Sequence, residues 1–148
     1  MLYRDGRLFC IGMQRYVETI PARTSSPGIV LQVTVGWTPA AQLEAAIFDT
    51  GASWTILNRD LARRLDLLDV EGELTLPLST RLGRFEGHLM RVPFVFPATE
   101  GMDLALVAPC LVCPEWYAPT FLGYQGLMDR LRFAVDPADN SFHFGVVG

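Results

Sequence analysis

The sequence predicts an all-β domain, a closed barrel of short strands with little helix. Apolar and polar residues alternate over several short stretches, which is the pattern of half-buried strands. Loops rich in glycine and proline separate these stretches, and no helical segment is long enough to connect parallel strands across a sheet. The chain has 148 residues, 50% hydrophobic and 19% charged, which is enough to bury the core of one compact domain.

The barrel is expected to begin with two neighbouring strands. Ile29–Trp37 alternates with period two, and the apolar stretch Gln42–Phe48 follows after a turn. The preceding residues, 1–28, show little periodicity and end in a loop-like run of proline, serine and glycine. We therefore expect an amino-terminal arm over residues 1–28 and one domain over residues 29–148.

A short helix and a hairpin are predicted next. Asn58 is a good helix cap, and leucines recur at helical spacing over Arg59–Leu67. Alternation returns in Glu73–Ser79 and in His88–Phe96. The intervening residues, 80–87, include two glycines among polar residues, and they predict a hairpin whose connection is too long for a tight turn.

The second half of the chain predicts more strands and a second short helix. We expect a strand over Met102–Val112, followed by an aromatic, proline-rich loop. A short helix is expected over Gln125–Leu131. The strands Arg132–Asp136 and Ser141–Val146 then form a terminal hairpin, because the residues between them carry a proline-containing turn signal.

Charge and composition exclude several classes of function. The net charge is -4 and the arginines are scattered, so we expect no nucleic-acid partner. All twelve basic residues are arginine, which excludes chemistry that depends on a lysine. The amino terminus lacks the apolar segment of a signal peptide, and no apolar run is long enough to span a bilayer. We expect a cytoplasmic protein with no membrane partner.

The cysteines and histidines do not predict a metal or redox site. Cys110 and Cys113 have the spacing of half a zinc or redox motif, but no second pair accompanies them, so we interpret them as small apolar residues. His88 and His143 are far apart in the sequence and lie beside no nucleophile or ligand motif. We therefore expect no metal and no cofactor.

One acidic residue stands out because it is flanked by apolar segments. Asp49-Thr50-Gly51 follows the apolar end of a predicted strand and precedes another apolar stretch. Burying a carboxylate is costly unless hydrogen bonds or a shared proton compensate, so such a group is usually kept for chemistry. Two carboxylates that share one proton can hydrolyse a peptide bond, one acting as base on water and the other as acid.

The chain resembles the retroviral-type (retropepsin-like) aspartic proteases. The likeness rests on the stretch from Ile47 to Ser53, which contains Asp-Thr-Gly, and on Phe121-Leu122-Gly123 before a short helix. It implies a retropepsin-like closed barrel with a flap hairpin and two short helices. Since only one Asp-Thr-Gly occurs, it also implies a homodimer in which the two Asp49 carboxylates meet on the two-fold axis and activate water. Chain termini often share an interface sheet in that family, and our candidates are the arm and Ser141–Val146.

The resemblance also assigns the site. The catalytic residues are Asp49, Thr50, whose hydroxyl locks the loop, and Gly51, whose N–H faces the carboxylate. The residues expected to bind a peptide substrate lie in the same loop and in the flap, Leu78–Leu89: Ala52, Ser53, Leu82, Gly83, Arg84 and Phe85. Trp37, Trp54 and Trp116 are interpreted as core, with lining of substrate subsites as the alternative.

Two alternatives remain open from the sequence. Residues 80–87 also fit an ordinary long hairpin with turn glycines. The domain also fits a catalytically inactive retropepsin-like module that binds peptides or has a structural role. Ser53 and Tyr124 stand where many viral members carry an acid and an arginine that pair near the dimer interface.

Overall fold

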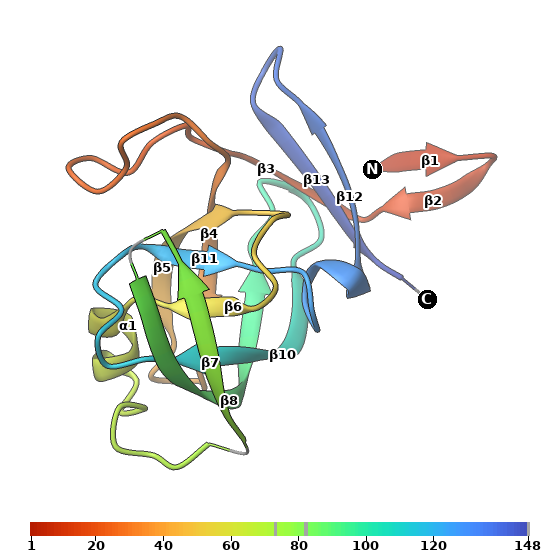
Figure 1. Ribbon diagram of the computed structural model, residues 1–148. Helices are drawn as coiled ribbons and strands as arrows, with labels where there is room; N and C mark the ends of the chain where they lie inside the picture. The colour runs from red at the N-terminus through yellow and green to blue at the C-terminus, as the bar shows by residue number, and fades with distance from the viewer. Residues whose placement is uncertain (73, 82, 148) are drawn as a thin grey trace.

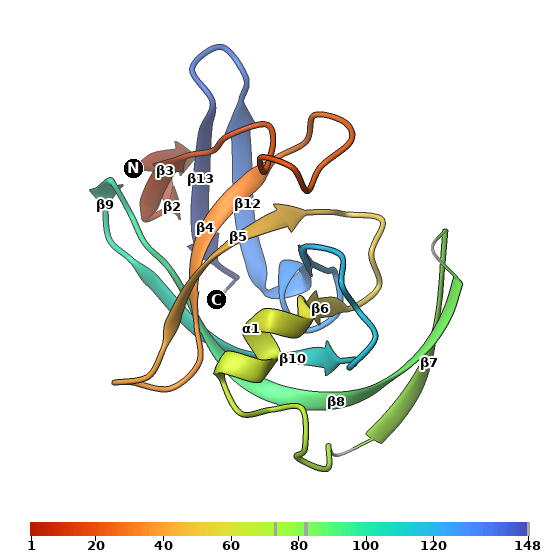
Figure 2. The same ribbon diagram turned by 90° about the vertical axis from the view of Figure 1, so that its left-hand side faces the viewer.

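Six strands close into a barrel in the computed structural model, which describes residues 1–72, 74–81 and 83–147 (Figures 1 and 2). Around the ring the strand order is β10-β6-β11-β5-β4-β8, and β8 pairs with β10 to close it. The β10–β6 and β11–β5 pairs are parallel and the other pairs are antiparallel. The barrel strands are β4 (Val30–Val35), β5 (Gln42–Phe48), β6 (Thr55–Leu57), β8 (Gly83–Phe96), β10 (Leu104–Val112) and β11 (Thr120–Leu122). The predicted all-β barrel is confirmed.

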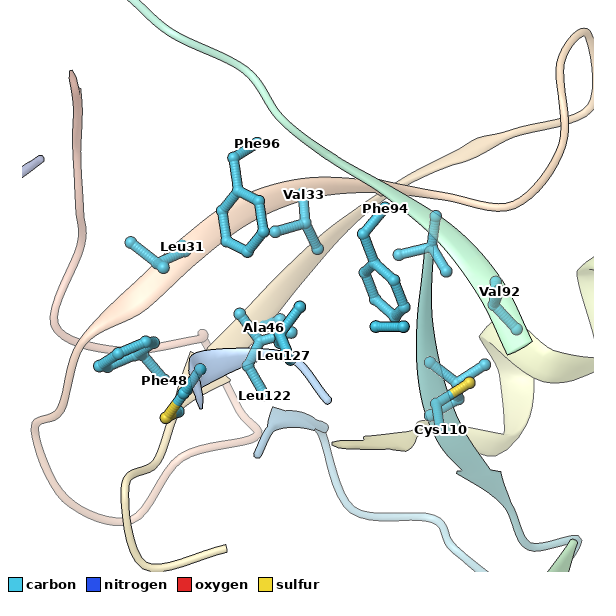
Figure 3. Close-up of a cluster of buried hydrophobic side chains, with 14 of the residues drawn as sticks. Leu31, Val33, Ala46, Phe48, Val92, Phe94, Phe96, Cys110, Leu122 and Leu127 are labelled. Atoms are coloured by element: carbon cyan, nitrogen blue, oxygen red, sulfur yellow. The ribbon is translucent and has the colours of Figure 1, made fainter. Parts of the chain in front are cut away.

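The barrel is filled by the apolar residues that alternate along its strands (Figure 3). Leu31 and Val33 of β4 are fully buried, whereas Gln32 between them is exposed. Phe94 and Phe96 of β8 enter the same core from the neighbouring strand. Each such side chain contributes about 1.5–3 kcal/mol through burial, so the period-two pattern accounts for the barrel interior.

The predicted short helix is present but ends early. Helix α1 spans Arg59–Arg64, and the Asn58 side chain accepts a 2.9 Å hydrogen bond from the amide of Asp60. Asp66 adopts a left-handed conformation with φ of 57°, which stops the helix before the predicted end at Leu67.

The hairpin predicted as the flap, for which we keep the name flap hairpin, is formed by β7 (Leu74–Thr80) and the first half of β8. Figure 2 shows the two strands curling away from the barrel wall. The prediction of a long connection over residues 80–87 is wrong, because Thr80 is paired with Gly83. Gly83 has a φ of +124°, which glycine adopts without steric cost, and the alternation of Arg84 and Phe85 then extends the strand.

The second predicted helix is reduced to one turn. A 3-10 helix, η1, spans only Met128–Arg130. Gly126 has a φ of +77°, a value incompatible with a right-handed helix, so the helix expected over Gln125–Leu131 cannot form there.

Both ends of the chain join a second sheet, which we call the terminal sheet. Its order is β12-β13-β3-β9, formed by Leu131–Asp136, Ser141–Val146, Gly12–Arg15 and Glu100–Gly101. The predicted carboxy-terminal hairpin is the β12–β13 pair. Figure 1 shows this hairpin beside the barrel, with β3 running along β13. β3, which belongs to the amino-terminal segment, therefore pairs with β13 of the same chain.

The first ten residues form a separate small hairpin. Strands β1 (Leu2–Arg4) and β2 (Arg7–Cys10) pair only with each other in the described sheets. Asp5 and Gly6 connect them, with positive φ values of 50° and 73°. This is the geometry that the Asp-Gly pair favours in a two-residue hairpin turn.

Candidate active site

Asp49 directly follows β5, at the end of the barrel. Its backbone amide donates a 3.1 Å hydrogen bond to the carbonyl of Leu122 in β11, and the preceding amide, of Phe48, bonds the carbonyl of Ile29 at 2.8 Å. The backbone at Asp49 is thus tied to both neighbouring strands of β5. This fixes where the carboxylate emerges from the barrel.

Residues 49–54, which we call the Asp49 loop, orient the carboxylate locally. The amide of Gly51 donates a 2.9 Å hydrogen bond to Oδ1 of Asp49, and the amide of Ala52 bonds the Asp49 carbonyl at 3.1 Å. Asp49 is half-buried, and among the described residues Oδ2 has no hydrogen-bond donor. One oxygen is therefore held by the loop, and the other is left for a water, a proton or a second carboxylate.

Residues 123–125, in the second half of the chain, hold this loop in place through hydrogen bonds. The buried amide of Gly123 donates a 2.9 Å hydrogen bond to Oγ1 of Thr55, and the amides of Tyr124 and Gln125 bond carbonyls of the Asp49 loop at 2.9 Å each. A Cβ at position 123 would lie 2.2 Å from the carbonyl carbon of Trp54. Only glycine permits this backbone-to-backbone approach.

The predicted catalytic residues are neighbours in the loop but differ in their contacts. Thr50 and Gly51 are exposed, and in the described part of the chain the Thr50 hydroxyl has no hydrogen-bond partner. Within one chain the loop is held by backbone hydrogen bonds and by the buried hydroxyl of Thr55. Thr55 was missed in the sequence, although a hydroxyl at the start of an apolar strand was the available signal. Ala52 is half-buried and Ser53 is exposed.

The flap hairpin packs on an apolar group that also contacts the Asp49 loop. We call this group the hairpin cluster; its residues are Trp54, Ile56, Leu76, Leu78, Phe85, Leu89, Leu111, Cys113, Trp116, Ala118 and Phe121. Phe85 meets Trp116 edge-on, with ring centroids 5.6 Å apart and planes at 86°, and Trp116 in turn contacts Phe121. Trp54 brings the Asp49 loop into the same cluster.

The predicted substrate-binding residues that the structure describes in the flap hairpin lie in two environments. Phe85 faces the cluster, whereas Gly83 and Arg84 are exposed at the free end of the hairpin. Leu82 lies outside the described residues. Two of the tryptophans, Trp54 and Trp116, are packed as expected, whereas Trp37 is 48% exposed in the β4–β5 connection.

A second half-buried carboxylate, Glu44, lies in β5, the strand that precedes Asp49. Glu44 accepts a 2.9 Å hydrogen bond from the Thr120 hydroxyl, and Arg64 lies 4.0 Å away. Burial raises the pKa of Glu44 above its ordinary value, and the Thr120 hydrogen bond and the positive charge of Arg64 offset part of that rise. The Thr120 hydroxyl also accepts from the Asn58 amide, so this group fixes β11 against β5 and helix α1.

The described residues contain no group of three histidine, cysteine or acidic side chains that could hold a metal ion. Cys110 lies in the barrel core and Cys113 lies in the hairpin cluster, so the two thiols belong to different apolar environments. Across the same described ranges, no helix has the length and apolar character needed to cross a membrane.

Solved structures with a similar fold exist for other proteins. One is a retropepsin-like aspartic protease from Rickettsia conorii, with a TM-score of 0.58, 17% identity, and coverage of 91% of this chain and 99% of that chain. Another is the retroviral protease-like domain of Ddi1 from Leishmania major, with a TM-score of 0.51, 20% identity, and coverage of 80% and 94%. No protein-family model matches the sequence, and no curated protein matches it. The likeness therefore concerns the fold.

Proposed function

Because this chain has a retropepsin-like fold, we propose that it is an aspartic endopeptidase that acts as a homodimer through Asp49 of each subunit. The observation that carries the proposal is the carboxylate of Asp49. It stands at the end of the barrel, its Oδ1 is held by the Gly51 amide at 2.9 Å, and its other oxygen is available. A half-buried carboxylate with one oxygen held by a backbone amide and the other oxygen available is suited to acid–base chemistry rather than to a structural role.

The reaction needs two such carboxylates with one proton between them. The ionised Asp49 takes a proton from water while the water oxygen bonds to the peptide carbonyl carbon. The protonated Asp49 of the other subunit gives its proton to the carbonyl oxygen, which yields a tetrahedral diol. The C–N bond then breaks as the nitrogen takes a proton from one carboxyl group and a diol hydroxyl returns its proton to the other. The pair finishes with one shared proton, as it began.

We propose a homodimer because one chain contains only one of the two catalytic aspartates that the reaction needs. Only one Asp-Thr-Gly sequence occurs, so a single subunit supplies half of the proton-sharing pair. Thr50 and Gly51 beside it are exposed, which leaves this side of the loop open to a second copy. A two-fold axis next to the loop places the same residues of both subunits face to face. In a crystal of the active dimer we expect the two carboxylates within about 3.5 Å of each other.

The proposed substrate is an extended peptide bound between the Asp49 loop and the flap hairpin. Ala52 and Ser53 would contact it from the loop, and Gly83, Arg84 and Phe85 from the hairpin. Extended peptides add to exposed backbone as an extra strand, and a hairpin tip with glycine suits that mode. The partly buried members of the hairpin cluster, among them Leu78 and Phe85, would contact apolar side chains of the peptide.

The decisive experiment compares Asp49→Asn with the unaltered protein. Cleavage of an unfolded protein substrate is followed by mass spectrometry from mildly acid to neutral pH, and solution mass is measured by sedimentation. We expect turnover to fall by at least about 10³-fold while the dimer persists, because asparagine keeps the shape but cannot exchange the proton.

The control for this experiment is Asp69→Asn, which removes one exposed carboxylate from the connector after helix α1. It should leave turnover unchanged. A strict monomer, or peptide binding without cleavage in the unaltered protein, would contradict the proposal. The latter result would instead identify a catalytically inactive peptide-binding module.

A further inference from the structure

The amino-terminal hairpin places two positive charges directly opposite each other. Arg4 of β1 and Arg7 of β2 are cross-strand partners, separated only by the tight turn at Asp5 and Gly6. Like charges in this position destabilise a hairpin. A two-stranded hairpin is already marginal by itself, so an arginine pair there calls for a compensating negative charge.

A third arginine approaches from another sheet. Arg132 in β12 lies with its guanidinium 5.7 Å from the centre of the Phe9 ring, which belongs to β2. This cation–π contact limits the orientations of the Arg132 side chain. The hairpin also touches β12 at Cys10, whose thiol lies 3.8 Å from the Arg132 carbonyl. Two sheets thus hold the three guanidinium groups around one hollow.

The hollow has a volume of about 430 Å³, and we call it the arginine pocket. Its lining consists of Arg4, Asp5, Arg7, Phe9 and Arg132, which gives three positive charges against one negative charge. The only carboxylate near a guanidinium here among the described residues is Asp5, whose contact with Arg4 is long, at 3.9 Å, and exposed. The lining is therefore positive by two charges in a chain whose net charge is -4.

We propose that the arginine pocket binds a phosphate-bearing anion. Guanidinium groups match phosphate oxygens with paired hydrogen bonds, and a phosphate monoester carries a charge of about -1.5 to -2 at neutral pH, which balances the lining. A ligand with a single carboxylate would balance only part of the positive charge of the lining. The pocket is formed by the amino-terminal hairpin and β12, so this binding is separate from the chemistry proposed for Asp49.

Nuclear magnetic resonance of the isotopically labelled full chain tests the proposal, with inorganic phosphate as the probe at low ionic strength. We expect saturable shifts of the backbone amides of residues 4–9 and 132. The double variant Arg4→Gln/Arg7→Gln should bind at least about tenfold more weakly. The matched control Arg23→Gln/Arg63→Gln removes the same charge from exposed positions elsewhere and should keep the affinity within about twofold.

A second measurement distinguishes a free phosphate from a lipid phosphate. Vesicles of phosphatidylcholine, with and without phosphatidic acid, are sedimented with the unaltered protein and both double variants. Phosphate binding without sedimentation indicates a soluble ligand, and sedimentation that depends on phosphatidic acid, Arg4 and Arg7 indicates a lipid headgroup. Neither double variant should unfold at a lower temperature than the unaltered protein. Absence of both kinds of binding, shifts spread evenly over the scattered arginines, or equal weakening in the control overturns the proposal.

Discussion

The amide of Gly123 donates a 2.9 Å hydrogen bond to the buried hydroxyl of Thr55, and this bond joins the two halves of the chain beneath Asp49. Thr55 begins β6 immediately after the Asp49 loop, and Gly123 directly follows β11. The amide is buried, so it has no water to replace the hydroxyl. The position of the loop therefore depends on one side chain that does not take part in the proposed chemistry.

Replacing Thr55 by valine should destabilise the protein by about 1–3 kcal/mol, because the buried Gly123 amide loses its acceptor while the side-chain shape is kept. Equilibrium unfolding in urea measures the loss. Thr55→Ser is the matched control, since serine keeps the hydroxyl and removes only a methyl group. A Thr55→Val protein as stable as the serine variant would contradict the assigned role.

Phe85→Ala should loosen the flap hairpin without unfolding the barrel. The substitution removes the edge-on contact with Trp116, and an aromatic pair of this kind contributes about 0.5–1.5 kcal/mol beyond simple burial. Hydrogen exchange of the β7 and β8 amides up to residue 89 should become faster, while β4 amides keep their protection. Arg84→Ala, at the adjacent exposed position, should change neither. Uniformly faster exchange in both regions would show that the hairpin is part of the cooperative core.

Glu44→Gln should stabilise the protein relative to the unaltered chain as the pH rises. Burial raises the pKa of Glu44 in the folded state, so the folded protein prefers the neutral carboxyl group. That preference stabilises the fold below the unfolded pKa, about 4.3, and is lost as the pH rises through the folded pKa. Glutamine stays neutral and keeps an acceptor for Thr120. The difference between the two unfolding free energies, compared at each pH, should grow in favour of the variant as the pH rises from the unfolded pKa through the folded pKa of Glu44. A difference that stays constant with pH would contradict the raised pKa of Glu44.

All three thiols should resist modification in the folded protein. Cys10, Cys110 and Cys113 are buried, and desolvation raises the pKa of each above its ordinary value, most strongly for Cys110. Since the thiolate is the reactive form, a thiol reagent should label the folded chain at least about a hundredfold more slowly than the unfolded chain. Rapid labelling of Cys113 under native conditions would instead indicate an accessible, reactive site.

Local alternation predicted the parts of the fold in which one strand face is buried. β5 and β13 have the predicted bounds, Gln42–Phe48 and Ser141–Val146, and the two stretches on which the resemblance rests meet where Gly123 contacts the Asp49 loop. These features depend on short-range patterns and on residue types with few alternatives, such as the glycine that backbone contact requires.

Features that depend on distant partners were not predicted. β3, Gly12–Arg15, has three buried residues in succession and no alternation, because β13 and β9 cover its two edges and neighbouring elements cover its faces. The β1–β2 hairpin has a local signal in the sequence, Asp5-Gly6, but the surrounding residues show too little alternation to predict its strands. The sequence predicts a loop at the hairpin turn because two glycines lie close together there, whereas residues 83–87 are paired in the strand.

The terminal sheet also constrains the order of folding. β3 pairs with β9 on one edge and with β13 on the other, so residues 12–15 find their second partner only at residues 141–144. During synthesis β3 leaves the ribosome while the whole barrel is still to be made, and the edge that pairs with β13 has no native partner until residues 141–144 follow. Contacts this distant in sequence form slowly, since the intervening chain must be ordered first. Assembly of this protein should therefore be limited by a late step that joins its two ends, after the barrel has closed.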